Sequence, residues 1–95
     1  MNENLIVQMV KDLENTRYYL HGYSYVRTLR NILVGNPSAV IAPHFKNKPY
    51  YGLYDYLALK RVEMMFDAAV AHHVLEVIYT DRGKLYCTSE YYVEK

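Results

Sequence analysis

The spacing of apolar residues changes near residue 74, and this change limits the possible folds more than any other feature of the sequence. Before it, five apolar side chains and one histidine recur at the spacing of a single helix face: Leu59, Val62, Phe66, Ala69, Val70 and His73. After it, β-branched and aromatic residues predict two extended runs, "VLEVIY" and "KLYCTSEYYV", joined by "TDRG". We therefore expect a long helix capped by Asp55, then a β-hairpin whose loop of about three to five residues uses a positive φ at Gly83.

Two further helices are expected nearer the N-terminus. Residues 2–14 place apolar side chains on one stripe, with Asn2 or Asn4 able to cap the first turn. Residues 24–34 form a second stripe, which Ser24 caps and Gly35 stops. Three prolines and two glycines then frame a connector, in which "AVIA" is either a short strand or a buried plug.

The order helix, helix, connector, helix and hairpin predicts an α+β, mainly helical fold. It matches a winged helix, in which a three-helix helix-turn-helix core carries a C-terminal β-hairpin wing. The 95 residues and their 52% hydrophobic content suit a single domain spanning residues 1–95. Apolar runs are far shorter than the roughly 20 residues that cross a bilayer, and Cys87 has no partner for an internal disulfide. We therefore expect a cytoplasmic protein with no membrane partner.

Positive charge is concentrated in the middle of the chain, although the net charge of the whole is only +1. Residues 16–62 contain seven basic residues and one acid, Asp55, which gives this segment a charge of +6. The segments on either side are acidic. Such clustering is typical of a surface that binds nucleic-acid phosphates.

Nine residues are the candidates for DNA contact: Arg27, Arg30, Lys46, Lys48, Tyr50, Lys60, Arg61, Arg82 and Lys84. Lys60 and Arg61 begin the long helix, where side chains and free N–H groups would meet phosphates. The two arginines of the second helix would hold the adjoining strand. For any single basic residue, a solvated position on an exposed face is the simpler alternative.

The stretch "KNKPYYGLYDY", residues 46–56, places four tyrosines beside two lysines. Tyrosine hydroxyls hydrogen-bond to phosphates and tyrosine rings stack on bases. Tyrosines also pack under loops, and we expect two of these four to do so. Tyr50 is the preferred DNA contact, because it follows Pro49 in the predicted loop and is not on a helix stripe.

The four histidines and Cys87 do not predict a metal site or a nucleophile. His72 and His73 are adjacent while His21 and His44 stand alone, so no metal-ligand spacing arises. We expect His73 to close the core row of its helix and His72 to favour the negative end of that helix. We expect no cofactor, no small-molecule substrate and no enzymatic activity.

Three stretches resemble the RecQ C-terminal (RQC) winged-helix domain: "YVRTLRNILVG", "KPYYG" and "VEMMFDAAVAHHVLEVIYTDRGKLYCT". The resemblance covers residues from about 5 to 92 and implies a free-standing DNA-binding module. Such a module would prefer duplex ends or forks, lie at the nucleoid and work with a protein partner in DNA metabolism. By the same resemblance, an aromatic residue of the hairpin acts as a wedge between strands, and Tyr79 or Tyr86 is the candidate. The sequence contains no phosphate-binding loop of a helicase motor, so we do not expect this chain to unwind DNA alone.

Two alternatives stay open. Strand alternation places Tyr79 in one row with Leu75 and Val77, so its ring could end the core instead of forming a wedge. The whole chain could also be a protein-interaction module or a self-associating adaptor, since tyrosine is enriched at interfaces and the net charge is near zero. Binding that falls steeply with salt would favour DNA, whereas binding that survives high salt would favour a protein partner.

Overall fold

The computed structural model describes residues 2–16, 19, 25–81 and 83–94. In this part of the chain, five helices and one antiparallel hairpin follow one another: α1 (Glu3–Glu14), α2 (Tyr25–Leu33), α3 (Ala42–Phe45), α4 (Leu59–Ala71), β1 (Glu76–Thr80), β2 (Gly83–Cys87) and α5 (Ser89–Glu94). The expected α+β, mainly helical class is confirmed. Helices α3 and α5 were not predicted from the sequence. None of the described helices is long and apolar enough to cross a membrane.

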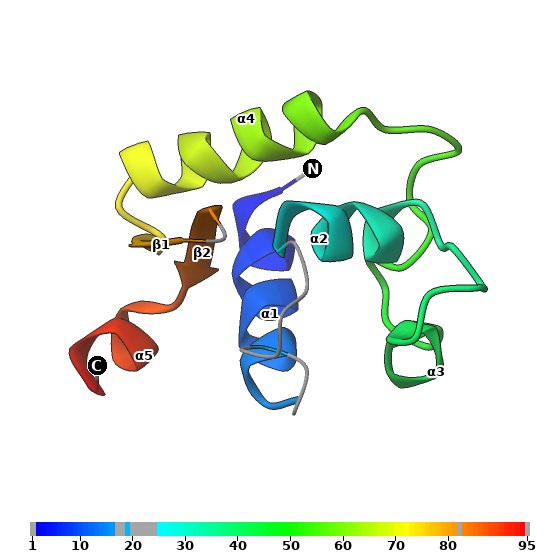
Figure 1. Ribbon diagram of the computed structural model, residues 1–95, viewed down its shortest axis with the longest axis horizontal. Helices are drawn as coiled ribbons and strands as arrows, with labels where there is room; N and C mark the ends of the chain where they lie inside the picture. The colour runs from blue at the N-terminus through cyan, green and yellow to red at the C-terminus, as the bar shows by residue number, and fades with distance from the viewer. Residues whose placement is uncertain (1, 17–18, 20–24, 82, 95) are drawn as a thin grey trace.

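Helix α1 forms as the sequence predicts, because its apolar stripe faces the core and its first turn is capped. Asn2 is the N-cap, and its side-chain oxygen accepts a hydrogen bond from the Leu5 N–H at 3.1 Å. The residues that α1 buries lie on one stripe: Ile6, Met9, Val10 and Leu13. The helix contacts both β2 and α4. Figure 1 shows α4 lying across the end of α1 at which the chain starts, with the hairpin on one side of α1 and α2 on the other.

The connector between α2 and α4 folds back onto the end of α2. The Gly52 N–H donates to the Ile32 carbonyl and the Tyr54 N–H donates to the Leu33 carbonyl, both at 3.0 Å. Gly35 ends α2 with a positive φ of 65°, as predicted. The end of the "KPYYG" stretch and Tyr54 are therefore held against the end of α2 by these two hydrogen bonds, which we call the clasp.

The "AVIA" stretch is not a strand. It forms turns that lead into α3, with Pro43 at the start of the helix, where the fixed φ of proline suits the first turn. Ile41 and Ala42 are buried. The alternative of a buried plug is therefore correct for the second half of the stretch only, since Val40 is 58% exposed.

Helix α4 starts later and ends earlier than its sequence pattern indicates. Its N-cap is Ala58 with no side-chain hydrogen bond, so the prediction that Asp55 caps it is wrong. The chain stays extended before Leu59 because Leu57 is buried and its carbonyl accepts a hydrogen bond from Arg30 Nε at 2.7 Å. His73 does not close the core row either. It is exposed and has a φ of 63°, which turns the chain from α4 into β1.

The hairpin forms as predicted, but its loop is shorter and its second strand ends earlier. Pairing runs from Glu76 opposite Cys87 to Thr80 opposite Gly83, whose φ is positive as expected. At the other end, the Thr88 N–H and hydroxyl both donate to the Glu14 carboxylate, at 2.6 and 2.9 Å. These bonds from α1 stop the strand, and the chain turns into α5. The predicted cap of α2, Ser24, lies outside the described residues.

Candidate nucleic-acid interface

The first turn of α4 presents two positive charges to solvent. Lys60 and Arg61 are exposed, and no described residue forms an ion pair with either. The first turn contains no acidic residue, and no side chain caps it. Since the first N–H groups of a helix lack partners within the helix and carry its positive dipole end, this turn favours an anion.

The segment before α4 is held in place by hydrogen bonds to α2. Arg30 lies on α2 and its Nε–H donates to the Leu57 carbonyl, so part of its guanidinium group serves the fold, and its contact with DNA stays a prediction. Arg27 lies one turn earlier on α2 and is exposed. Tyr56 lies between Tyr54, whose N–H donates to the Leu33 carbonyl, and Leu57, whose carbonyl accepts from Arg30. It is 74% exposed. The sequence analysis counted Tyr56 among four possible tyrosine contacts but preferred Tyr50, because it expected the helix to begin just after Asp55, whereas residues 56–58 lie outside any helix.

Beyond its first turn, the solvent-facing side of α4 carries no polar side chain other than Glu63 and Asp67, which are partly exposed and are paired with Lys84 of the hairpin. Met64 is 54% exposed, and Ala68 and Ala71 follow on the same face. Sequence-specific readers of DNA place polar side chains on this part of a recognition helix. Any binding by α4 therefore depends on charge and on contacts that do not distinguish base pairs.

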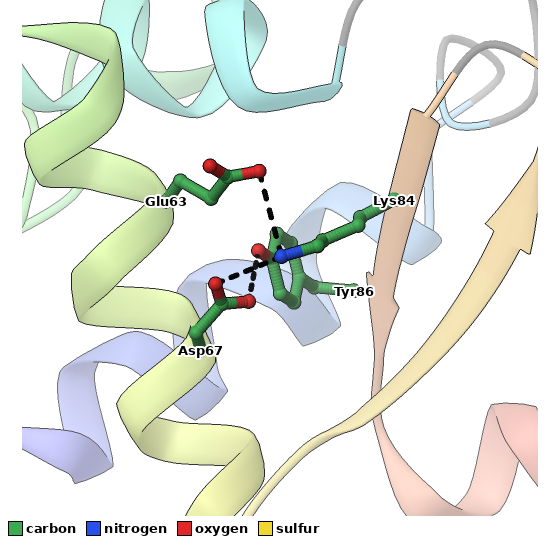
Figure 2. Close-up of polar contacts among 4 residues, drawn as sticks. All are labelled: Glu63, Asp67, Lys84 and Tyr86. Atoms are coloured by element: carbon green, nitrogen blue, oxygen red, sulfur yellow. Dashed lines mark hydrogen bonds and ion pairs between the residues drawn. The ribbon is translucent and has the colours of Figure 1, made fainter.

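Lys84 is engaged in ion pairs between the hairpin and α4. Its Nζ lies 2.8 Å from Asp67 Oδ2 and 3.5 Å from Glu63 Oε2 (Figure 2). Tyr86 reaches the same helix, because its hydroxyl donates to Asp67 Oδ1 at 2.6 Å. The prediction of Lys84 as a free phosphate contact is therefore wrong. Two acids of α4 lie within reach of its ammonium group, and they offset its charge.

These contacts change the acidity of the groups involved. Partial burial disfavours the charged form of Asp67, but the hydrogen bonds from Lys84 and Tyr86 together with the Lys84 charge outweigh it, so the pKa of Asp67 falls below its usual value. Its hydrogen bond to Asp67 raises the pKa of Lys84. Burial, followed by the Asp67 hydrogen bond, raises the pKa of Tyr86 far above its usual value. The hairpin is thus joined to α4 by charged groups that stay charged near neutral pH.

The two wedge candidates of the hairpin differ in exposure. Tyr86 is buried, with its ring centroid 5.4 Å from that of Phe66, so it cannot act as a wedge. Tyr79 is 75% exposed, and the alternative that its ring ends the core row is wrong. In the hairpin register Tyr79 is opposite Lys84, and the two side chains share the strand face that turns toward α4. Of the two wedge candidates, Tyr79 is therefore the one with an exposed ring.

Tyr50, the preferred tyrosine, is fully buried and cannot contact DNA. Its hydroxyl donates to Asp12 Oδ2 at 2.5 Å, and its ring lies 6.1 Å from that of Phe45. Burial and the bond to Asp12 raise the pKa of Tyr50 well above its usual value. The ring is drawn inside because α1 supplies a carboxylate acceptor for its hydroxyl.

Two more of the four tyrosines in this stretch, Tyr51 and Tyr54, pack against the core. Packing therefore accounts for three of the four, where two were expected.

Lys46 and Lys48 do not join Lys60 and Arg61 on one surface. Lys46 follows the end of α3 and is exposed, and Lys48 lies 3.7 Å from Asp12 of α1. Figure 1 shows α3 at the lower right of the view, whereas α4 runs along the top. Arg82 lies outside the described residues. The described structure therefore divides the predicted DNA-binding set into separate regions.

Cysteine and histidine chemistry finds no support in the described geometry. Cys87 is buried, and burial, followed by the nearby charges of Glu14 and Glu76, raises the pKa of its thiol to about 11. His72 lies 2.6 Å from the Glu3 carboxylate, which links the end of α4 to the start of α1. Within the described ranges, no group of three or more potential ligands is positioned to hold a metal ion.

Comparisons of this chain with protein-family models, with curated proteins and with solved structures found no match.

Proposed function

We propose that this protein binds DNA through the phosphate backbone without catalysing a reaction, and that α1, α2, α4 and the hairpin act as a winged helix. The observation that carries the proposal is the first turn of α4. There, Lys60 and Arg61 are exposed, no acid is present and no side chain occupies the helix end. Phosphates bind well at such a position because both side chains and backbone N–H groups meet them.

The place of the hairpin supports this proposal. The hairpin is tied to the side of α4 by Lys84, and it carries the exposed ring of Tyr79. In a winged helix of the RQC kind, which the sequence resembles, the wing lies beside the recognition helix at a duplex end or fork. The connector, from Val34 to Ala58, is much longer than the turn of about three to four residues in a simple helix-turn-helix. Its clasp on α2 nevertheless brings the start of α4 beside α2.

The proposal is tested by measuring fluorescence anisotropy of labelled blunt and forked duplexes at low and moderate salt. We expect the affinity of the wild type to fall as salt rises, and Lys60→Ala/Arg61→Ala to weaken binding to both DNAs. Loss of two phosphate contacts should reduce the slope of log K against log salt by about two. Lys46→Ala is the matched control, because it removes an exposed lysine at the end of α3, a helix that lies apart from α4.

The proposal fails if neither DNA binds at low salt. It also fails if the double variant folds, as judged by its thermal melt, and binds as tightly as the wild type. A loss as large in Lys46→Ala as in the double variant would place the binding site elsewhere.

A protein-interaction function is the second candidate, and exposed apolar side chains favour it. Val93 on α5 is 82% exposed, Tyr92 beside it is about half exposed, and Met64 faces solvent on α4. Such side chains are enriched at interfaces when they form patches. Self-association that persists in high salt, measured by sedimentation of wild type and of Val93→Asp, would support this function over DNA binding.

A further inference from the structure

We infer that Tyr56 makes the DNA site selective for unpaired nucleotides, with its ring stacked on a base while Lys60 and Arg61 hold neighbouring phosphates. The inference rests on the proposed DNA-binding function and names the form of DNA that the same site prefers.

The first step is the exposure of the ring. Tyr56 is 74% exposed, whereas its neighbours Tyr50, Tyr51 and Tyr54 are buried or packed against the core. No hydrogen bond of its hydroxyl is found in the described part of the chain. Removing a tyrosine ring from water is favourable, so a ligand that covers the Tyr56 ring gains binding free energy.

Second, hydrogen bonds and burial hold the backbone on both sides of Tyr56. On one side of Tyr56, the Tyr54 N–H donates to the Leu33 carbonyl at 3.0 Å. On the other side, the Leu57 side chain is buried and its carbonyl accepts from Arg30 Nε at 2.7 Å. Leu57 turns its side chain into the core while the ring of Tyr56 beside it stays exposed. The ring is therefore presented before any ligand arrives, which lowers the entropic cost of binding.

Third, the Tyr56 ring lies near the charges of Lys60 and Arg61 along the chain. Lys60 is four residues after Tyr56, so their Cα atoms are at most about 14 Å apart when the chain is fully extended. The span is shorter here because the chain enters the helix at Leu59. A base on the ring and phosphates on Lys60 and Arg61 can therefore belong to neighbouring nucleotides of one strand.

The fourth step concerns the state of the bases. In a duplex, base faces are covered by the adjacent base pairs, and proteins read base edges in the grooves. Beyond the first turn, the solvent-facing side of α4 has Met64, Ala68 and Ala71, which cannot pair with base edges, and the carboxylates of Glu63 and Asp67, which are engaged by Lys84. An exposed tyrosine ring instead accepts the face of any unpaired base. The site therefore suits a single strand or the strand that leaves a fork.

The test compares wild type, Tyr56→Ala and Tyr56→Phe on a single-stranded oligonucleotide and on a blunt duplex of the same length at one salt concentration. Stacking of one base corresponds to an affinity change of about 5- to 150-fold. We expect Tyr56→Ala to lose that much on the single strand and less than about twofold on the duplex, while Tyr56→Phe keeps the wild-type affinity because its ring still stacks. Tyr92→Ala is the matched control, since it removes another exposed tyrosine on the distant helix α5.

A second readout reports the stacking itself. The fluorescence of 2-aminopurine in the single strand should be quenched by wild type and by Tyr56→Phe, and should stay bright with Tyr56→Ala at saturating protein. If both DNA forms bind with salt dependence but Tyr56→Ala changes neither affinity, or changes both equally, the inference is overturned and the proposed function stands. If no DNA form binds at low salt, both are overturned.

Discussion

Replacing Gly35 by alanine should destabilise the protein much more than the same replacement at Gly52, although both glycines have positive φ. Their φ values are 65° and 70°, a region in which an L-residue costs about 1–2 kcal/mol. The surroundings differ. A Cβ on Gly35 would lie 3.0 Å from the Gly52 Cα and 3.2 Å from a ring carbon of Tyr51, whereas a Cβ on Gly52 would meet nothing closer than 3.8 Å.

The clash at Gly35 is difficult to relieve, because the Gly52 N–H is hydrogen-bonded to the Ile32 carbonyl. Forcing extra atoms into close packing costs about 1–3 kcal/mol. We therefore expect Gly35→Ala to lower the free energy of unfolding by about 2–5 kcal/mol and Gly52→Ala by about 1–2 kcal/mol. The loss of freedom in the unfolded chain is similar for both replacements, so it cancels in the comparison.

Thermal and urea unfolding of the two variants would measure this difference. For a domain of this size, each kcal/mol shifts Tm by about 4–8 °C, so Gly35→Ala should melt at least several degrees below Gly52→Ala. Equal melting temperatures would refute the reasoning, because the close approach of the connector to α2 would then contribute nothing to the free energy of unfolding. The view that this contact holds the segment before Tyr56 in place would then be unsupported as well.

Three further outcomes follow from other contacts. Asp67→Asn should lower stability at pH 7 by about 1 kcal/mol. Because the pKa of Asp67 is lowered in the folded protein, its contribution is present above the unfolded pKa of about 3.9 and is lost as pH falls through the folded pKa. Urea titrations of variant and wild type should therefore converge below about pH 4, and an unchanged gap there would contradict this. Glu14→Ala removes both bonds to Thr88, so hydrogen exchange should accelerate in α5 and not in α4; equal acceleration would argue against a local tie. Cys87 should resist alkylation at pH 8, since its thiol is buried with a pKa of about 11, and labelling at the rate of an exposed thiol would disprove that protection.

The parts of the fold that could be predicted are those in which local pattern and burial agree. Stripes of apolar residues predicted α1, α2 and α4, and a turn glycine between β-rich runs predicted the hairpin. Helix α5 could not be predicted, because alternating and helical spacing are indistinguishable in six residues. The deciding contact is between Thr88 and Glu14, which are 74 positions apart in the sequence. The positions at which β2 ends and α5 begins are therefore set by tertiary hydrogen bonds and not by intrinsic propensity.

The candidate site shows the same division. Lys60 and Arg61 were predicted to be exposed because they lie off the apolar stripe of their helix, and they are exposed. Tyr50 and Lys84 were misassigned because their partners, Asp12 and Asp67, come from other elements. A sequence lists charges and hydroxyls in order, but it does not show which carboxylate each will meet after folding.

This pairing also changes what the positive middle segment can do. Lys48 of that segment meets Asp12 of α1, and Lys84 of the hairpin meets Asp67 of α4, so acids from the flanking segments offset charges that look free in the sequence. Two exposed cations remain at the start of α4, so the salt dependence of binding should have a slope of about two to three instead of the larger values of proteins with many phosphate contacts. Electrostatics alone would then give only weak binding. Useful affinity at physiological salt requires a contribution that salt does not screen, and the exposed ring of Tyr56 is the group next to those cations that could supply it.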